Sequence, residues 1–337
     1  MALGDSAKEL ADGAKAAEAA GIEGIWAIEL YRSTITQATW LASQTESIGI
    51  GTGITWAFTR SPFLLAVSAL DIDEISGGRF RLGLGAGVKR LNERWHGVEY
   101  GRPAPHLRET VEATRLIMDS ANSGAPIRYE GEYHDIDIKG WTRPHPALRE
   151  KVPIYVAAVG EGMARMAGDV ADGALGHLIC STRWLEEVML PNIEKGLARS
   201  GRRRSDFDFI PGVCVAIAND DSEVEAAYDA ARKTLAFYAT VRTYAHVFDL
   251  DGFGSHAEQV GNAFRAGDLA GVAAAVTDEM VDAYCAVGTV DRVREKVGEV
   301  AALGDSISLG PPTYFIPPEE IAEYQGRVLE TFGPANR

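Results

Sequence analysis

The chain has 337 residues, of which 46% are hydrophobic, and its formal net charge is −15 at pH 7. This composition suits one large α/β domain (1–337), and the acidity excludes a nucleic-acid partner, because phosphate backbones are bound by clustered Lys and Arg. No apolar run approaches the roughly 20 residues that cross a bilayer, and the three cysteines lack zinc or disulfide spacing. We therefore expect a cytoplasmic protein with no membrane contact and no metal.

In chain order, the first part alternates helices with short apolar strands. The predicted helices cover 6–20, 33–44, 61–75 and 107–118, and the predicted strands cover 24–29, 48–55 and 79–85. Nearly continuous apolar strands between helices are typical of a parallel sheet that is covered on both faces.

The second part continues this alternation with two interruptions. Residues 124–151 are polar and contain Pro, so we predict a loop excursion, and residues 222–281 are predicted to be a helical insertion. The predicted strands cover 154–156, about 175, 209–218 and 306–309, and the predicted helices cover 163–170, 184–200, 289–303 and 317–329.

Seven strands result, whereas a TIM (β/α)8 barrel has eight. The missing strand should precede the helix at 6–20, where only Met1–Asp5 remain. Either the natural start lies upstream, or residues 1–3 are a remnant of that first strand. A barrel with an open seam would expose strand edges, so an open doubly wound sheet is the alternative fold.

The segment from Val152 to His177 has the pattern strand, small-residue turn, helix, strand. The turn, Ala157–Gly162, would present backbone N–H groups at the N-terminus of the following helix, which is where proteins bind phosphate. We predict that it holds the phosphate of a flavin-like cofactor. The alternative is that its glycines only turn the chain.

Four motifs, read together, resemble the luciferase-like monooxygenase superfamily. They are Thr59–Pro62, Ser76–Gly87, Ala157–Gly160 and Ala167–Gly173. Within the superfamily, the chain is most similar to the actinobacterial oxidoreductases that use the deazaflavin coenzyme F-420 (8-hydroxy-5-deazaflavin). The resemblance implies a TIM barrel with the cofactor at the C-terminal mouth of its strands, and a homodimer.

The resemblance also implies where the cofactor lies. A non-prolyl cis bond between Gly53 and Ile54 would press on the central ring. Glu161 departs from the family, since many relatives carry Pro at this position. A carboxylate would repel a phosphate beside it, so it is compatible with the site only if it points to solvent. The implied cofactor contacts are Gly53, Ile54, Thr55, Ala86, Gly87, Val159, Gly160, Glu161, Gly162, Met163 and His177.

The reaction is harder to predict. Glu29 ends the first predicted strand where relatives that oxidise a sugar phosphate carry Asp-His, and their second acid falls on Val88. A sugar phosphate is therefore disfavoured as the substrate. Glu29 is the candidate catalytic residue, as a proton donor or a hydrogen-bond partner of the cofactor, unless it is merely an exposed acid. Trp56 and Phe58 either line a substrate pocket or belong to the core.

The leading hypothesis is therefore hydride transfer between F-420 and a small organic substrate. One alternative is an FMN-dependent luciferase-like monooxygenase, which would share the barrel. Another is a protein that binds a deazaflavin or flavin without turnover. A dinucleotide site is rejected, because the run Gly83–Gly87 lacks the third glycine of that fingerprint.

Overall fold

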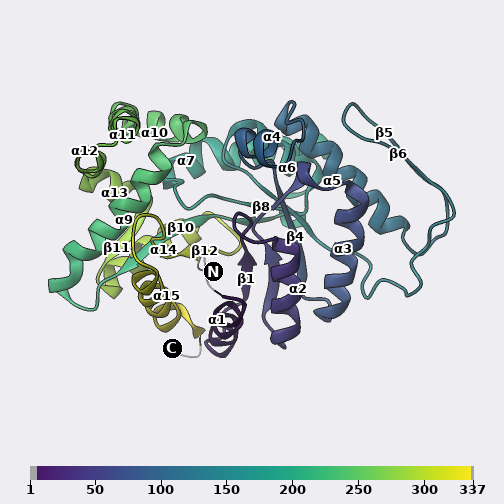
Figure 1. The fold of residues 1–337 in the computed structure, drawn as a ribbon, viewed down its shortest axis with the longest axis horizontal. Coiled ribbons are helices and arrows are strands. Elements are labelled where there is room, and N and C mark those ends of the chain that lie inside the picture. The colour runs from purple at the N-terminus through teal and green to yellow at the C-terminus, as the bar shows by residue number, and fades with distance from the viewer. Residues whose placement is uncertain (1–5, 335–337) are drawn as a thin grey trace.

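The protein is built around a curled parallel sheet with helices packed on its outer face (Figure 1). The computed structural model describes residues 6–334. Within these residues, seven strands form the larger sheet: β1 (Gly24–Ala27), β2 (Gly49–Thr52), β3 (Thr55–Trp56), β4 (Phe80–Gly85), β7 (Ile154–Ala157), β8 (Gly173–Leu175) and β9 (Asp208–Ile210). A smaller sheet consists of β10 (Gly212–Ile217), β11 (Cys285–Gly288) and β12 (Ser308–Gly310).

Strands of the larger sheet pair in the order β1-β2-β4-β7-β8-β9, and β3 pairs with β4. Strands of the smaller sheet pair in the order β11-β10-β12. Only Pro211 separates β9 from β10, because proline has no N–H to donate to the ladder. Within residues 6–334, β1 pairs only with β2 and β12 only with β10, which leaves a seam between β1 and β12. The strand expected before the first helix falls on Met1–Asp5, outside the described residues.

The helices that accompany the strands mostly follow the predicted positions. They are α1 (Ala7–Ala19), α2 (Thr34–Gln44), α3 (Pro62–Ile75), α4 (Lys89–Trp95), α5 (Pro103–Ser120), α6 (Glu161–Val170), α7 (Thr182–Trp184), α8 (Leu190–Ser200), α14 (Val290–Ala301) and α15 (Pro318–Phe332). Helix α15 lies beside α1, since a Cβ on Gly13 would be 3.8 Å from Nε2 of Gln325. These two helices flank the seam (Figure 1).

The predicted helical insertion is helical throughout most of its length. It consists of α9 (Val224–Ala239), α10 (Ala245–Leu250), α11 (Gly254–Ala266), α12 (Leu269–Ala274) and α13 (Asp278–Tyr284). In Figure 1 these helices form a group on one side of the sheet, opposite the hairpin of β5 (Ile127–Glu130) and β6 (Asp135–Ile138).

Three elements differ from the sequence prediction. Strand β11 was missed, because four residues between two helices carry no periodic signal. The β5–β6 hairpin lies within 124–151, which was predicted to be a loop excursion. Its alternation of apolar with charged residues, as in Ile136 and Ile138 flanked by Asp135 and Asp137, is the pattern of a half-exposed strand and could have revealed it. Helix α4 was also not predicted.

Glycines make room for large side chains inside the barrel. A Cβ on Gly51 would lie 2.2 Å from Cζ3 of Trp26, and one on Gly53 would lie 2.8 Å from the Trp26 Cβ. In the same way, a Cβ on Gly85 would lie 2.0 Å from Cδ1 of Ile54. The interior is therefore packed by alternating large and absent side chains, as in other barrels of this size.

Arg79, from the Gly-rich motif, ties α2 to the start of β4. Its Nη2 donates to the carbonyl oxygens of Ala42 (3.0 Å) and Thr45 (2.9 Å), and its Nη1 donates to that of Ile48 (2.6 Å). Its Nε donates to the carbonyl oxygen of Ser76 (2.6 Å). One guanidinium thus satisfies four backbone carbonyls, including those at the C-terminal end of α2.

Candidate active site

The predicted site residues follow the C-terminal ends of five parallel strands. Glu29 follows β1, Gly53 and Ile54 follow β2, Ala86 follows β4, and His177 follows β8. The turn at 159–163 follows β7. Because parallel strands all end at the same edge, these segments share one rim of the sheet, which is where barrel enzymes build their sites. The structure thus brings the predicted positions to one rim, although the cofactor and substrate roles assigned to them stay predictions.

The Gly53–Ile54 peptide bond is cis, as the resemblance implies. The Ile54 side chain lies against β4 and β7, because a Cβ on Gly85 would be within 2.0 Å of Ile54 Cδ1 and 3.4 Å of the Ala157 Cβ. Thr55 is buried, and its hydroxyl lies 2.8 Å from that of Thr34 at the start of α2. Ile54 therefore forms part of the inner surface of the rim.

The loop after β4 is fixed by side chains from α4 and the segment that follows it. Asn92 Nδ2 donates to the Ala86 carbonyl (2.9 Å), and the Tyr100 hydroxyl donates to the Gly87 carbonyl (3.1 Å). Gly87 has φ +64°, and a Cβ there would be 3.2 Å from Cγ of Trp56. This glycine is required both by its left-handed backbone and by the indole ring packed on it.

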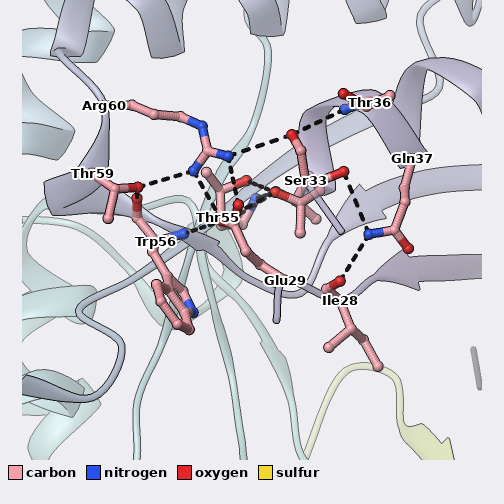
Figure 2. Close-up of polar contacts among 12 residues, drawn as sticks. Ile28, Glu29, Ser33, Thr36, Gln37, Thr55, Trp56, Thr59 and Arg60 are labelled. Atoms are coloured by element: carbon pink, nitrogen blue, oxygen red, sulfur yellow. Dashed lines mark hydrogen bonds and ion pairs between the residues drawn. The ribbon is translucent and has the colours of Figure 1, made fainter. Parts of the chain in front are cut away.

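Glu29 forms a two-armed ion pair with Arg60 (Figure 2). Nη2 of Arg60 donates to Oε1 at 2.5 Å, and Nη1 donates to Oε2 at 2.9 Å. The backbone N–H of Trp56 also donates to Oε2, at 2.8 Å. The side chains of Glu29 and Arg60 are only 11% and 16% exposed. Glu29 therefore links the loop after β1 to the segment after the cis bond.

Both carboxylate oxygens of Glu29 thus already accept hydrogen bonds from the chain itself. Arg60 makes two further hydrogen bonds, to Thr59 Oγ1 (3.1 Å) and Ser33 Oγ (3.4 Å), which hold the guanidinium in place. Charge-assisted bidentate pairs of this kind fix geometry strongly. The partnership was missed from the sequence, because 31 residues separate the two side chains.

The turn after β7 has the geometry of an anion site. Gly160 is the N-cap of α6 and makes no side-chain cap. In the described structure, no acceptor pairs with the backbone N–H groups of Glu161, Gly162 or Met163, as expected for a first helical turn. The Glu161 side chain is 67% exposed and turns towards Arg165, 3.9 Å away. The carboxylate thus points to solvent and leaves the N–H groups free.

Trp184 and His246 pack against the turn after β7. Nε1 of Trp184 donates to the Val159 carbonyl at 2.8 Å. A five-residue π-helical segment, Leu185–Met189, begins directly after Trp184, and such segments are frequent near functional sites. The His246 ring packs on the indole, with centroids 5.0 Å apart, and its Nε2 lies 3.5 Å from where a Cβ on Gly160 would be. Neither residue was predicted, because a lone His in a helical insertion has no telling spacing.

His177 lies in a cluster of aromatic rings. Its Nε2 is 3.2 Å from the Tyr244 hydroxyl, and its ring contacts those of Tyr238 and Tyr244 at centroid distances of 4.7 Å. Its Nδ1 is buried and has no hydrogen-bond partner in the part of the chain that the structure describes. Burial lowers the pKa of His177 to about 4, so the imidazole is neutral at pH 7.

The two aromatic residues predicted to line a substrate pocket are buried. Trp56 packs edge-on against His96, with ring centroids 5.4 Å apart. Phe58 stacks face to face on His106 of α5 at 3.8 Å, and Tyr133 stacks on His106 at 4.2 Å. Phe58 therefore connects the sheet to α5 and to the β5–β6 hairpin, and little of its surface is open to a ligand.

Residues 6–334 contain neither a membrane-spanning helix nor a cluster of metal ligands. No helix in this range is long and apolar enough to cross a membrane. No group of three or more His, Cys, Asp or Glu side chains in it is arranged to hold a metal ion.

A family model described as luciferase-like monooxygenase matches residues 1–306. An uncharacterized protein of Mycobacterium tuberculosis is 36% identical over 288 residues, which are 84% of each chain. The 5,10-methylenetetrahydromethanopterin reductase of Archaeoglobus fulgidus is 34% identical over 297 residues, which are 86% of this chain and 85% of the reductase. The solved coenzyme F-420-dependent tetrahydromethanopterin reductase of Methanopyrus kandleri superposes with a TM-score of 0.80 at 24% identity, covering 100% of this chain and 98% of that one. The likeness of fold supports a luciferase-like TIM barrel.

Proposed function

Because the chain belongs to the luciferase-like monooxygenase family, we propose that this oxidoreductase transfers a hydride between coenzyme F-420 and a small organic substrate. The observation that carries the proposal is the first turn of α6, where three unpaired N–H groups face away from the Glu161 carboxylate. A phosphate is the group that such a turn binds best. The reductases that resemble the chain support F-420 as the cofactor.

The chain fits a flat cofactor that carries a phosphate. Backbone N–H groups of Glu161, Gly162 and Met163 would hold the phosphate, while Ile54 and the backbone of Ala86 would lie against the rings. A bound deazaflavin supplies or accepts a hydride at a ring carbon. The protein then has to orient the substrate, exclude water and handle one proton.

The cofactor can be identified by titrating the purified protein with F-420 and, separately, with FMN. We expect F-420 to quench protein fluorescence with a saturating curve and to raise Tm. Binding of FMN alone would favour the monooxygenase alternative, and binding of neither would contradict both proposals. Tight F-420 binding with no hydride transfer to any ketone or enone, and none from any alcohol, would leave a binding protein without turnover.

Two substitutions at Gly162 test the phosphate turn directly. A Cβ on Gly162 would meet nothing within 4 Å, so Gly162→Ala should keep the fold and the affinity. Gly162→Asp places a carboxylate beside the free N–H groups, where it competes with and repels a phosphate. We expect the Kd for F-420 to rise at least about tenfold in Gly162→Asp only, since removing a charge-assisted hydrogen bond costs about 1.5–3 kcal/mol. Equal affinities of the two variants would place the phosphate elsewhere.

A further inference from the structure

Four segments bring aromatic rings together beside the candidate site. His177 follows β8, Tyr238 ends α9, Tyr244 precedes α10, and Tyr314 follows β12. The His177 and Tyr238 rings meet edge-on at 4.7 Å, and the Tyr238 and Tyr314 rings meet at 5.3 Å. Phe237 stacks on Tyr314 at 3.6 Å. We call these five residues the ring cluster; each is half-buried, so part of each side chain can still contact a ligand.

The hydrogen bonds within the ring cluster are incomplete. A neutral imidazole has one N–H and one lone pair, and Tyr244 has one O–H. His177 Nε2 bonds the Tyr244 hydroxyl, but Nδ1 is buried without a partner in the described residues. When Nε2 carries the proton it donates to Tyr244, and the phenol O–H is then free for a third group. Buried polar atoms without a hydrogen-bond partner are rare in folded proteins, so this one needs a reason.

Other proton carriers near the rim are already engaged or turned away. Both oxygens of Glu29 accept from Arg60. Glu161 points to solvent. Cys180 is buried, so its thiol has no surface on which to meet a ligand. Tyr244 and His177 are a hydrogen-bonded pair of neutral groups at this rim, which suits them to handle a proton.

We propose that the ring cluster is the substrate site, that it binds an uncharged planar ketone or enone, and that Tyr244, held by His177, donates a proton to the carbonyl oxygen. The proposal rests on the proposed function, which supplies the reductant. In a ketone reduction, a hydride from the reduced cofactor adds to the carbonyl carbon. The π electrons move to oxygen, the Tyr244 O–H bond breaks, and that proton forms the alcohol O–H. The phenolate then takes a proton from solvent.

The neutral side chains of the ring cluster are the reason for choosing an uncharged, planar substrate. Burial raises the pKa of Tyr238 and of Tyr244, with Tyr314 adding to both shifts, so these phenols keep their protons. Burial keeps His177 neutral. Neutral aromatic rings stack favourably on a flat apolar group, and no charged side chain in the ring cluster would pair with a charged one. One phenol donor in a desolvated setting is suited to an oxygen on which charge develops.

The test uses acetophenone labelled with ¹³C at its carbonyl, because a carbonyl that accepts a hydrogen bond lowers its infrared stretching frequency. The label is bound to the full-length protein with and without oxidised F-420. We expect a lowered frequency in the wild type, a smaller shift in His177→Asn, and a frequency close to that in an apolar solvent in Tyr244→Phe. Tyr129→Phe removes a phenol on the β5–β6 hairpin and should behave as the wild type.

The rate measurement follows oxidation of reduced F-420 by acetophenone. Tyr244→Phe should lower kcat at least about 100-fold, which is the lower range for loss of a general acid, with KM and the Kd for F-420 changed less than about threefold. His177→Asn should lower kcat less and keep the fold, which circular dichroism would check. A wild-type rate and frequency in Tyr244→Phe would overturn the proton role.

The failures can be told apart. A wild type that binds F-420 but none of acetophenone, benzaldehyde and cyclohexenone would overturn the substrate class alone. A wild type that does not bind F-420 would overturn the proposed function. In that case the frequency measured without cofactor still decides whether Tyr244 donates to a carbonyl.

Discussion

Arg60 donates hydrogen bonds to both carboxylate oxygens of Glu29, although the two residues are 31 positions apart in the sequence. The same carboxylate accepts a hydrogen bond from the backbone N–H of Trp56. The acid predicted to be catalytic thus makes contacts that hold two rim loops together. Trp56 is the second residue after the cis bond, so the carboxylate helps to set the path of the chain at Ile54.

Glu29→Gln should therefore reduce stability more than catalysis. The amide N–H2 group would face the N–H donors of Arg60 or Trp56. We therefore expect the free energy of unfolding, measured in urea, to fall by about 2 kcal/mol. We expect kcat to fall less than about tenfold. Glu132→Gln is the control, because its partner Arg102 is exposed and the loss should stay below about 0.5 kcal/mol. A stable Glu29→Gln protein with kcat lowered 100-fold would instead make Glu29 the proton donor.

Arg79→Lys should destabilise the protein although the charge is kept. Lysine cannot reach the carbonyls of Ala42, Thr45, Ile48 and Ser76 with one ammonium group, so several would lose their donor. We expect a loss of about 3 kcal/mol in chemical denaturation. Arg128→Lys on the hairpin surface, where the side chain is 70% exposed, should change stability by less than about 0.5 kcal/mol. Equal losses of stability in the two variants would mean that the hydrogen bonds of Arg79 to the four carbonyls contribute little to stability.

Two substitutions at Phe315 can distinguish the cost of its backbone conformation from the loss of its side-chain contacts. It is the non-glycine residue with positive φ (60°) in the described structure, and its ring is 52% exposed. Phe315→Ala and Phe315→Gly both remove the ring, but only glycine adopts this backbone freely. We expect Phe315→Gly to be more stable than Phe315→Ala by about 1 kcal/mol in thermal unfolding. A less stable glycine variant would mean that the left-handed conformation carries no strain.

Acid should destabilise the protein through His177. Its pKa is about 4 in the folded state against 6.5 for the ordinary side chain, so the unfolded chain binds the proton more readily. Stability then falls as the pH drops from 6.5 towards 4, by up to about 3 kcal/mol, and is unaffected by this group above pH 6.5. Unfolding measured from pH 7.5 to 4 should show a weaker pH dependence in His177→Asn. Parallel curves would exclude His177 as the source.

The barrel was predictable because each of its strands and helices is marked by a pattern within a short stretch of sequence. Short apolar strands alternate with helices, and prediction and structure agree on most of them, including α2 and β4. Strand β11 escaped because Cys285–Gly288 gains its strand character only by pairing with β10. The alternating charges of the β5–β6 hairpin were in the sequence, but the polar, Pro-containing composition around them hid the pattern.

The site was predictable only in part, for the same reason. The turn after β7 follows from a motif that is contiguous in sequence, and the cis bond was implied by the resemblance to the family. The contact between Glu29 and Arg60, and that between His177 and Tyr244, join residues 31 and 67 positions apart. Nothing in the spacing of such pairs marks them, because only the folded chain brings them together.

The β5–β6 hairpin is attached to the body by stacked rings and by hydrogen bonds, among them those of Tyr129 to Glu112 and of His134 with Thr110. The Phe58, His106 and Tyr133 rings form the stack, and Glu109 accepts the backbone N–H groups of the hairpin turn. The bends at Gly124 and Gly140 touch nothing within 4 Å of an added Cβ. A peptide tag or a fluorophore inserted at either bend would therefore start from a position with free space around it, and this makes the two bends convenient handles for immobilising the enzyme.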